Sequence, residues 1–319
     1  MKHYLASIPH EFFWLFGSLV VLLGLASTIG TVLARRPADE KKAASRANLV
    51  ARVNAWWVMV AILAVAFLCG STMTLVLFAL ASFFALREFI TLTPNRPGDR
   101  LSLSLSFFVI IPAQYVLIGL ERYGTFAIFI PVYAFLLLPS IAALRSDIDD
   151  FLSRMAKQQW ALMVTVYCLS HAPALLMLPL PGERSRNALL LFYLLLVVQM
   201  SDVMQYVFGK LFGKTKIAPL VSPSKTVEGF IGGGLAATGI GAAMWWITPF
   251  TPLESAGVAA IIVVMGFLGG LTLSAVKRSL GAKDWGVMIE GHGGMLDRTD
   301  SICFAAPIFF HVVRFFYTT

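Results

Sequence analysis

Long apolar runs separated by short polar segments extend over almost the entire chain. An apolar helix needs about 20 residues to cross the hydrocarbon core of a bilayer. The pattern therefore predicts an all-α, polytopic integral membrane protein with helices over residues 12–34, 55–69, 72–91, 101–120, 125–144, 159–180, 187–207, 227–250, 256–274 and 301–318. Because the run 55–69 is short and is followed directly by Gly70-Ser71, we expect nine or ten transmembrane helices.

Composition excludes an ordinary soluble protein. Hydrophobic residues make up 58% of the 319 residues and charged residues only 13%, so no large soluble domain is expected. The three cysteines, Cys69, Cys168 and Cys303, lie in apolar runs and form no CxxC pair, so neither a disulfide framework nor a zinc site is indicated. The first apolar run is too long for the core of a signal peptide and is interpreted as a retained helix.

Positive charges predict the orientation. If the N-terminus faces outside, the polar segments that face inside hold 20 of the 25 Lys and Arg residues; these segments are 35–54, 87–100, 145–158, 208–226 and 275–300. Such an excess is typical of cytoplasmic loops, and it explains the net charge of +8 without a nucleic-acid partner. We therefore expect a bacterial inner-membrane protein with an outside N-terminus, and we interpret 35–54 as a charged linker.

The two halves of the chain differ in chemical content. Residues 1–186 contain no convincing chemical motif and are predicted to form a transmembrane scaffold. Residues 187–319 carry the polar clusters and are predicted to form a transmembrane catalytic region with cytoplasmic loops 208–226 and 275–300.

One carboxylate interrupts the apolar run 187–207. Asp202 shares a helical face with Gln199, Gln205 and Tyr206. A carboxylate at this depth is costly, so it indicates either a functional site or a structural ion pair.

A basic segment rich in glycine and serine follows, from Gly209 to Gly233. We expect Ser222-Pro223 to begin a helix, with serine as the cap and proline at the first helical position. A helix N-terminus binds anions, and Lys225 adds a point charge for a polyphosphate. The segment is not a Walker A loop, and the spacing of Gly229 and Gly233 is equally compatible with helix packing.

The densest polar segment covers residues 274–301. Its cations are suited to phosphate oxygens, and they are Lys277, Arg278, Lys283 and Arg298. Its carboxylates are hard oxygen ligands suited to Mg²⁺, and they are Asp284, Asp297 and Asp300. Asp297 and Asp300 share a face if helical, and His292-Gly293-Gly294 lets the backbone approach a ligand closely.

These segments resemble the phosphatidate cytidylyltransferase (CDP-diacylglycerol synthase) family of membrane enzymes. One family signature reads S-x-x-K-R-x4-K-D-x-G followed by P-G-H-G-G-x-x-D-R-x-D, and it is matched at Ser274, Lys277, Arg278, Lys283, Asp284, Gly286, Gly291, His292, Gly293, Gly294, Asp297, Arg298 and Asp300. An upstream S-P-x-K-T-x-E-G-x-x-G-G element is matched at Ser222, Pro223, Lys225, Thr226, Glu228, Gly229, Gly232 and Gly233. The motifs cover about the last 120 residues of the chain.

The resemblance implies transfer of a cytidylyl group from CTP to phosphatidic acid, with Mg²⁺ and a second metal ion as candidate cofactors, membrane lipids as surroundings and a homodimer as a candidate assembly. Catalytic roles would fall on Lys283, Asp284, His292, Asp297 and Arg298. Substrate contacts would fall on Ser222, Lys225, Thr226, Glu228, Ser274, Lys277, Arg278, Gly293 and Gly294, and metal binding on Asp202, Asp284, Asp297 and Asp300.

The chain departs from the family pattern at three positions. Gly270 stands where the family usually has aspartate, Glu290 replaces a proline, and Trp285 replaces a small residue. These departures indicate a divergent paralogue. Two alternatives therefore stay open: a CTP-using enzyme that acts on another lipid acceptor, and a catalytically impaired lipid-binding or transport protein.

Overall fold

The computed structural model describes residues 9–34, 40–181, 186–288 and 293–318. Continuous helices in these ranges are α2 (His10–Ala34), α3 (Glu40–Leu68), α4 (Ser71–Thr91), α11 (Asn187–Phe212), α12 (Val227–Ala243), α13 (Pro252–Ser279) and α14 (Leu296–Tyr317). In the described part of the chain, eight helical segments are long and apolar enough to cross a membrane, and Val53–Leu68 and Val227–Ala243 are shorter apolar helices. The prediction of an all-α polytopic membrane protein is confirmed, and each of the ten apolar runs lies on a helix.

Three crossings consist of α-helices joined by π-helical turns. The first joins α5 (Arg100–Leu105) to α6 (Ile111–Gly119), the second joins α7 (Tyr123–Ile128) to α8 (Phe135–Ala143), and the third joins α9 (Phe151–Leu162) to α10 (Leu169–Ala174). Each crossing carries a proline, namely Pro112, Pro131 or Pro173. Proline lacks an N–H group, and local π adjustments let a membrane helix satisfy the backbone groups that proline leaves free.

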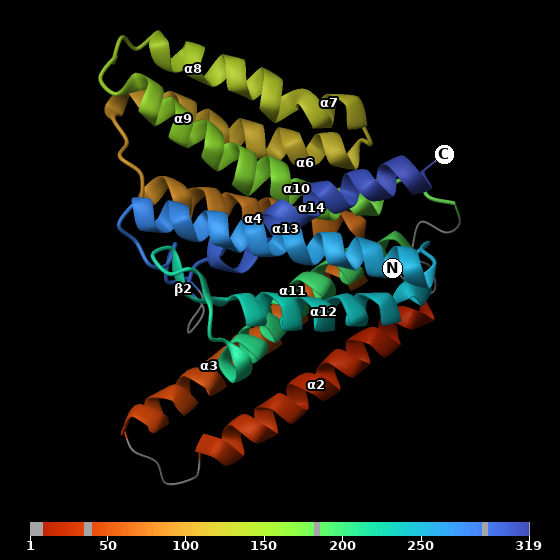
Figure 1. Ribbon diagram of the computed structural model, residues 1–319. Helices are drawn as coiled ribbons and strands as arrows, with labels where there is room; N and C mark the ends of the chain where they lie inside the picture. The colour runs from red at the N-terminus through yellow and green to blue at the C-terminus, as the bar shows by residue number, and fades with distance from the viewer. Residues whose placement is uncertain (1–8, 35–39, 182–185, 289–292, 319) are drawn as a thin grey trace.

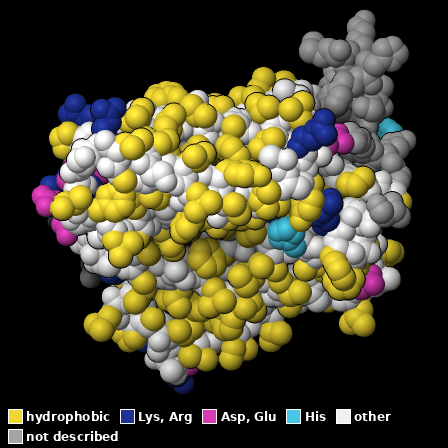
Figure 2. Space-filling view, turned by 90° about the horizontal axis from the view of Figure 1, so that it is seen from above, with side chains coloured by type: hydrophobic (Ala, Val, Ile, Leu, Met, Phe, Trp, Pro, Cys, Tyr) yellow, Lys and Arg dark blue, Asp and Glu magenta, His cyan; other side chains and the backbone are white. Residues whose placement is uncertain are grey.

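Polar turns gather at one end of the helix bundle. In Figure 1 the hairpin of β1 (Lys216–Ala218) and β2 (Ser222–Thr226), the end of α13 and the start of α3 lie at the left. The start of α2 and the end of α14 lie at the right. Figure 2 shows an apolar band across the middle of the molecule. Most charged side chains in this view lie near the two ends. Large apolar side chains such as Phe108 (72%) and Leu136 (61%) are exposed on the bundle, as expected for contact with lipid.

Close glycine contacts hold α12 against α11. A Cβ atom on Gly233 would lie 2.3 Å from the backbone nitrogen of Gln205, and one on Gly229 would lie 2.9 Å from the Gln205 carbonyl oxygen. A Cβ atom on Gly232 would lie 2.4 Å from the Phe208 ring. These glycines therefore serve helix packing, which small residues permit in membranes.

Two local expectations are wrong. The charged segment 35–54 is not simply a linker, because α3 begins at Glu40 and continues through its charged part into the membrane. Ser222-Pro223 does not begin a helix, because both residues lie in β2, which pairs with β1 in antiparallel fashion. Helix α12 begins instead at Val227, where the Thr226 hydroxyl accepts a hydrogen bond from the Gly229 N–H (3.1 Å) and caps the helix.

Candidate active site

Asp202, Lys225 and Asp300 come together from three separate elements. The Ser301 hydroxyl of α14 donates to the Asp202 carboxylate of α11, at 3.1 and 3.3 Å from its two oxygens. Asp300, the residue before Ser301, accepts a hydrogen bond from the Ser301 N–H at 2.7 Å. Lys225 of β2 interacts electrostatically with both carboxylates. We call Asp202, Lys225 and Asp300 the α14 cluster.

The ammonium group of Lys225 is held in a largely buried position. Its Nζ atom donates to the Phe267 carbonyl oxygen at 3.3 Å and lies 4.5 Å from the centre of the Phe267 ring. Burial lowers the pKa of Lys225, whereas the carboxylates of Asp202 and Asp300 act in the opposite direction. The charged form of this lysine therefore depends on the two carboxylates beside it.

A second ion pair lies at the start of α14. Lys277 Nζ is 2.5 Å from Asp297 Oδ1, and both side chains are nearly buried. Asp297 Oδ2 accepts hydrogen bonds from the backbone N–H groups of Trp285 (2.8 Å) and Gly294 (2.9 Å). Both oxygens of Asp297 are thus engaged by charge-assisted bonds, which are the strong ones in proteins.

Gly293 fits the same contact. It adopts a left-handed φ of +80°, and a Cβ atom there would lie 2.7 Å from Asp297 Oδ2. Glycine is the residue that takes this conformation without strain. Gly293 and Asp297 therefore shape the loop that leads into α14.

Sequence reasoning missed Glu88, a residue of α4 in the predicted scaffold. Its carboxylate accepts the backbone N–H groups of Met295 (2.8 Å) and Leu296 (2.9 Å) at the start of α14. A Cβ atom on Gly294 would lie 2.3 Å from the Glu88 carboxylate. The one available signal was an acidic residue next to an apolar run, which is costly near a membrane unless it is partnered.

The other predicted site residues lie in less central positions. Arg278 Nε donates to the Val221 carbonyl oxygen at 3.3 Å, between the end of α13 and the hairpin. The Ser274 hydroxyl donates to the Gly270 carbonyl oxygen at 2.6 Å. Lys283 and Asp284 are exposed. His292 lies outside the described residues.

The motif residues of the hairpin have local structural contacts. Glu228 accepts the backbone N–H groups of Lys214 (3.0 Å) and Thr215 (3.1 Å), and so joins the first turn of α12 to the segment before β1. Thr226 caps α12, and Ser222 pairs with Ala218 in the hairpin. These contacts place Lys225 beside α11 and α13.

The α14 cluster offers two carboxylate groups to a metal ion. Among the described residues, no three or more His, Cys, Asp or Glu side chains form a group able to hold a metal ion. Mg²⁺ commonly takes one or two carboxylates together with substrate phosphates and water, and Asp202 and Asp300 supply two. A Cβ atom on Gly270 would lie 3.0 Å from Lys225 Nζ and 3.7 Å from Asp300 Oδ2, so an aspartate there would add a third carboxylate.

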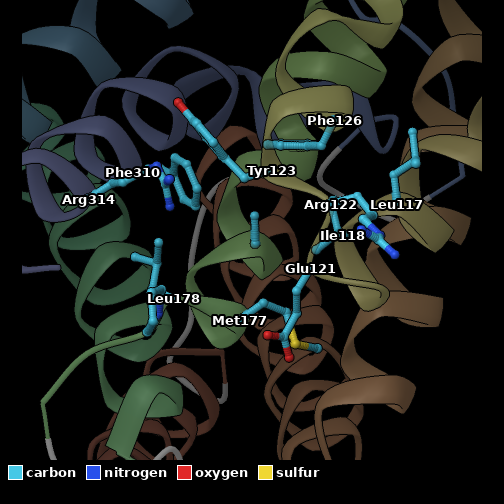
Figure 3. Close-up of a pocket in the computed structure, with 12 residues that line it drawn as sticks. Leu117, Ile118, Glu121, Arg122, Tyr123, Phe126, Met177, Leu178, Phe310 and Arg314 are labelled. Atoms are coloured by element: carbon cyan, nitrogen blue, oxygen red, sulfur yellow. The ribbon is translucent and has the colours of Figure 1, made fainter. Parts of the chain in front are cut away.

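A small cavity lies near each end of the bundle. One of about 140 Å³ adjoins the α14 cluster and is lined by Asp202, Gln205, Tyr206, Ser224, Lys225, Thr226, Phe230 and Phe267. Another of about 230 Å³ lies at the opposite end, where Figure 3 shows Arg122, Tyr123 and Arg314 among the lining side chains. The guanidinium of Arg314 lies 3.5 Å from the centre of the Tyr123 ring. This second cavity shares no lining residue with the α14 cluster.

The fold is that of an all-α integral membrane protein whose carboxylates and cations gather at one end of the bundle. Residues 50–316 match the model of the cytidylyltransferase family, and the chain belongs to this family of nucleotidyltransferase-like enzymes of phospholipid biosynthesis. The resemblance found in the motifs is thereby confirmed.

Individual relatives are similar over different lengths. The chain is 37% identical over 306 residues to the uncharacterized protein YnbB of Escherichia coli (strain K12). The alignment covers 93% of this chain and 97% of that protein. It is 41% identical over 127 residues to a phosphatidate cytidylyltransferase of Staphylococcus aureus (strain COL). That alignment covers 39% of this chain and 49% of the relative. A phosphatidate cytidylyltransferase of Staphylococcus haemolyticus (strain JCSC1435) is 35% identical over 158 residues, or 61% of its length. The chain thus spans about half to three fifths of these two enzymes.

Proposed function

We propose that this protein transfers the cytidylyl group of CTP to phosphatidic acid, giving CDP-diacylglycerol and pyrophosphate. The observation that carries the proposal is the convergence of Asp202, Lys225 and Asp300 from α11, β2 and α14 in a member of the cytidylyltransferase family. Cations and carboxylates that meet in this way suit a reaction between two phosphorylated substrates.

The chemistry requires charge neutralisation more than proton transfer. An oxygen of the lipid phosphate attacks the α-phosphorus of CTP, and the bond from that phosphorus to pyrophosphate breaks. Because the lipid phosphate is already ionised, no strong general base is needed, and the barrier is the approach of two anions. Lys225, Lys277 and Arg298 would neutralise phosphate oxygens, while Asp297 fixes Lys277 in place.

Mg²⁺ is the proposed cofactor, and whether a second metal ion takes part is open. Asp202 and Asp300 would hold the ion, which would neutralise charge on the triphosphate. Lys283, Asp284 and His292 remain proposed substrate or metal contacts from the loop before α14. Ser222, Arg278 and Ser274 would then act by positioning the hairpin and α13.

We place the reaction on the cytoplasmic face of a bacterial inner membrane, with the N-terminus outside. The support is the distribution of Lys and Arg, of which 20 of 25 lie in segments on one side. The polar hairpin lies at that end of the bundle (Figure 1).

A second candidate function is favoured by Gly270. Without the usual aspartate, the described part of the chain offers two converging carboxylates where the family pattern would supply three. The protein would then use CTP with a different lipid acceptor, or bind or transport lipid phosphates without turnover.

The test is an assay of the purified full-length protein in detergent with phosphatidic acid, Mg²⁺ and radiolabelled CTP. We expect labelled CDP-diacylglycerol and pyrophosphate, and we expect Asp284→Asn to abolish turnover without unfolding the protein. CDP together with an acceptor lipid that has gained one phosphoryl group would instead identify a CTP-dependent kinase. Wild-type turnover in Asp284→Asn would remove Asp284 from the site, and absence of any product would favour the non-catalytic alternative.

A further inference from the structure

A mostly apolar cavity lies between the N-terminal helices and the site-bearing helices. Its volume is about 270 Å³, and its walls come from α2, α3, α4, α11 and α14. The apolar walls include Trp56 and Met59 of α3, Ala81 of α4, Leu196 of α11 and Ile302 of α14. Neighbouring side chains on the same helices face outward, since Val58 is 58% and Leu80 is 51% exposed. Ile62 lines the cavity and is itself 49% exposed, so the cavity borders the outer surface of the bundle.

The polar side chains of the cavity come from α11 and α14, near the α14 cluster. Gln199, Arg298 and Thr299 are the polar side chains that line it. The Nε atom of Arg298 is buried and has no hydrogen-bond partner. Arg298 lines the cavity and also interacts electrostatically with Asp202 and Asp300.

The buried Nε–H group of Arg298 is left without an acceptor, which is costly, and an oxygen of a bound anion would satisfy it. A phosphate suits this geometry, because the planar guanidinium binds its oxygens in a bidentate manner. A soluble phosphate compound would leave the apolar walls without a partner. An anionic head attached to a hydrocarbon chain uses both features.

We propose that this cavity receives an acyl chain of the lipid acceptor and that Arg298 binds the phosphate of the same molecule. The inference rests on the proposed function and deepens it, because it assigns the acyl chain and the phosphate of the acceptor to particular side chains of the bundle. Since bilayer chains are as apolar as the cavity walls, the cavity contributes position rather than affinity. It would hold the phosphate close to a CTP molecule bound at the α14 cluster.

The experiment measures lipid binding without CTP, so that a failure of turnover and a failure of this inference are separable. The full-length protein is placed in nanodiscs of phosphatidylcholine that contain phosphatidic acid with a diazirine midway along one acyl chain. After irradiation, mass spectrometry locates the labelled residues. We expect labels on Trp56, Met59 and Ala81, displaced by excess phosphatidic acid but not by diacylglycerol or inorganic phosphate.

Variants sharpen the result. Ala81→Trp fills the cavity and should abolish labelling of Trp56 and Met59, whereas Leu80→Trp, on the next residue of the same helix, should leave it unchanged. Arg298→Gln should reduce specific labelling about tenfold, the effect of a lost charged hydrogen bond.

Three outcomes would overturn the proposal. The first is labelling that is equally strong on outward residues such as Val58 and Leu80. The second is equal displacement by diacylglycerol, which lacks the phosphate. The third is equal displacement by inorganic phosphate, which lacks the chain. Specific labelling in a protein that forms no CDP-lipid would retain the lipid cavity and reject only the proposed reaction.

Discussion

Asp297 and Asp300 lie one turn apart on α14, yet their surroundings differ sharply. Asp297 accepts hydrogen bonds from Lys277 and from two backbone N–H groups, so both of its oxygens are engaged. Within the described part of the chain, the Asp300 carboxylate accepts a hydrogen bond only from the N–H of its neighbour Ser301, and it lies near Asp202 and Lys225. The comparison suggests that the first carboxylate builds the loop before α14, whereas the second retains the capacity to bind a ligand.

The largest effect on stability is expected from breaking the Asp297 contacts. Asp297→Ala leaves the Lys277 ammonium nearly buried without its counter-charge, and loss of one partner of a buried pair costs about 3–5 kcal/mol. Thermal unfolding in detergent measures the change. The double variant Asp297→Leu/Lys277→Met should recover part of the loss, and a single variant as stable as the unmodified protein would show that Asp297 does not build the loop.

Asp300→Asn should lower activity while leaving stability nearly unchanged. Turnover of CTP should fall about 100-fold or more, because a group that organises charge in the transition state is lost. The melting temperature should stay close to that of the unmodified protein, since the amide oxygen can still accept the Ser301 N–H. The roles assigned to the two carboxylates would be reversed if Asp297→Asn were inactive but as stable as the unmodified protein, and Asp300→Asn were active.

Gly270→Asp tests whether the α14 cluster lacks one ligand. The new carboxylate would lie near Lys225 Nζ, whose flexible side chain can shift, and near Asp300. We expect the Mg²⁺ concentration at half-maximal turnover to fall about tenfold, because each added carboxylate tightens a hard-cation site. Gly270→Asn is the matched control of equal size, and an identical magnesium response in both variants would contradict a metal role for this position.

The smallest effect concerns pH. Burial lowers the pKa of Lys225, so its ammonium loses the proton at lower pH than an exposed lysine does, and turnover should decline earlier on the alkaline side. Arginine stays charged in this range, so Lys225→Arg should move the alkaline decline to higher pH. Lys214→Arg, on an exposed residue, should not move the profile. Equal profiles for all three proteins would show that Lys225 does not set the decline.

The sequence predicted the helical fold well, because the length of an apolar run is fixed by the thickness of the bilayer. It also predicted that Asp297 and Asp300 share a face of one helix, which follows from helical periodicity. Their different surroundings were beyond prediction, because Trp285 and Gly294 reach Asp297 through the path of the loop.

Three further points could not be decided from the sequence, each for a physical reason. Ser222-Pro223 matches the signature of a helix start, but the pairing of β2 with β1 overrides this local preference. The glycines of α12 fit either ligand binding or packing, and only the position of α11 decides in favour of packing. Glu88 was missed because its partners lie 207 and 208 residues further along the chain.

That separation also bears on how the protein is made. The start of α14 is fixed by a carboxylate that enters the membrane early in synthesis, and the N–H groups it binds are made near the end. The loop that carries Lys283 and Asp284 can therefore take its final shape only after the first and last parts of the bundle have met. A chain that stalls or inserts incompletely would hold the charged residues apart, so an incomplete molecule would lack the proposed site.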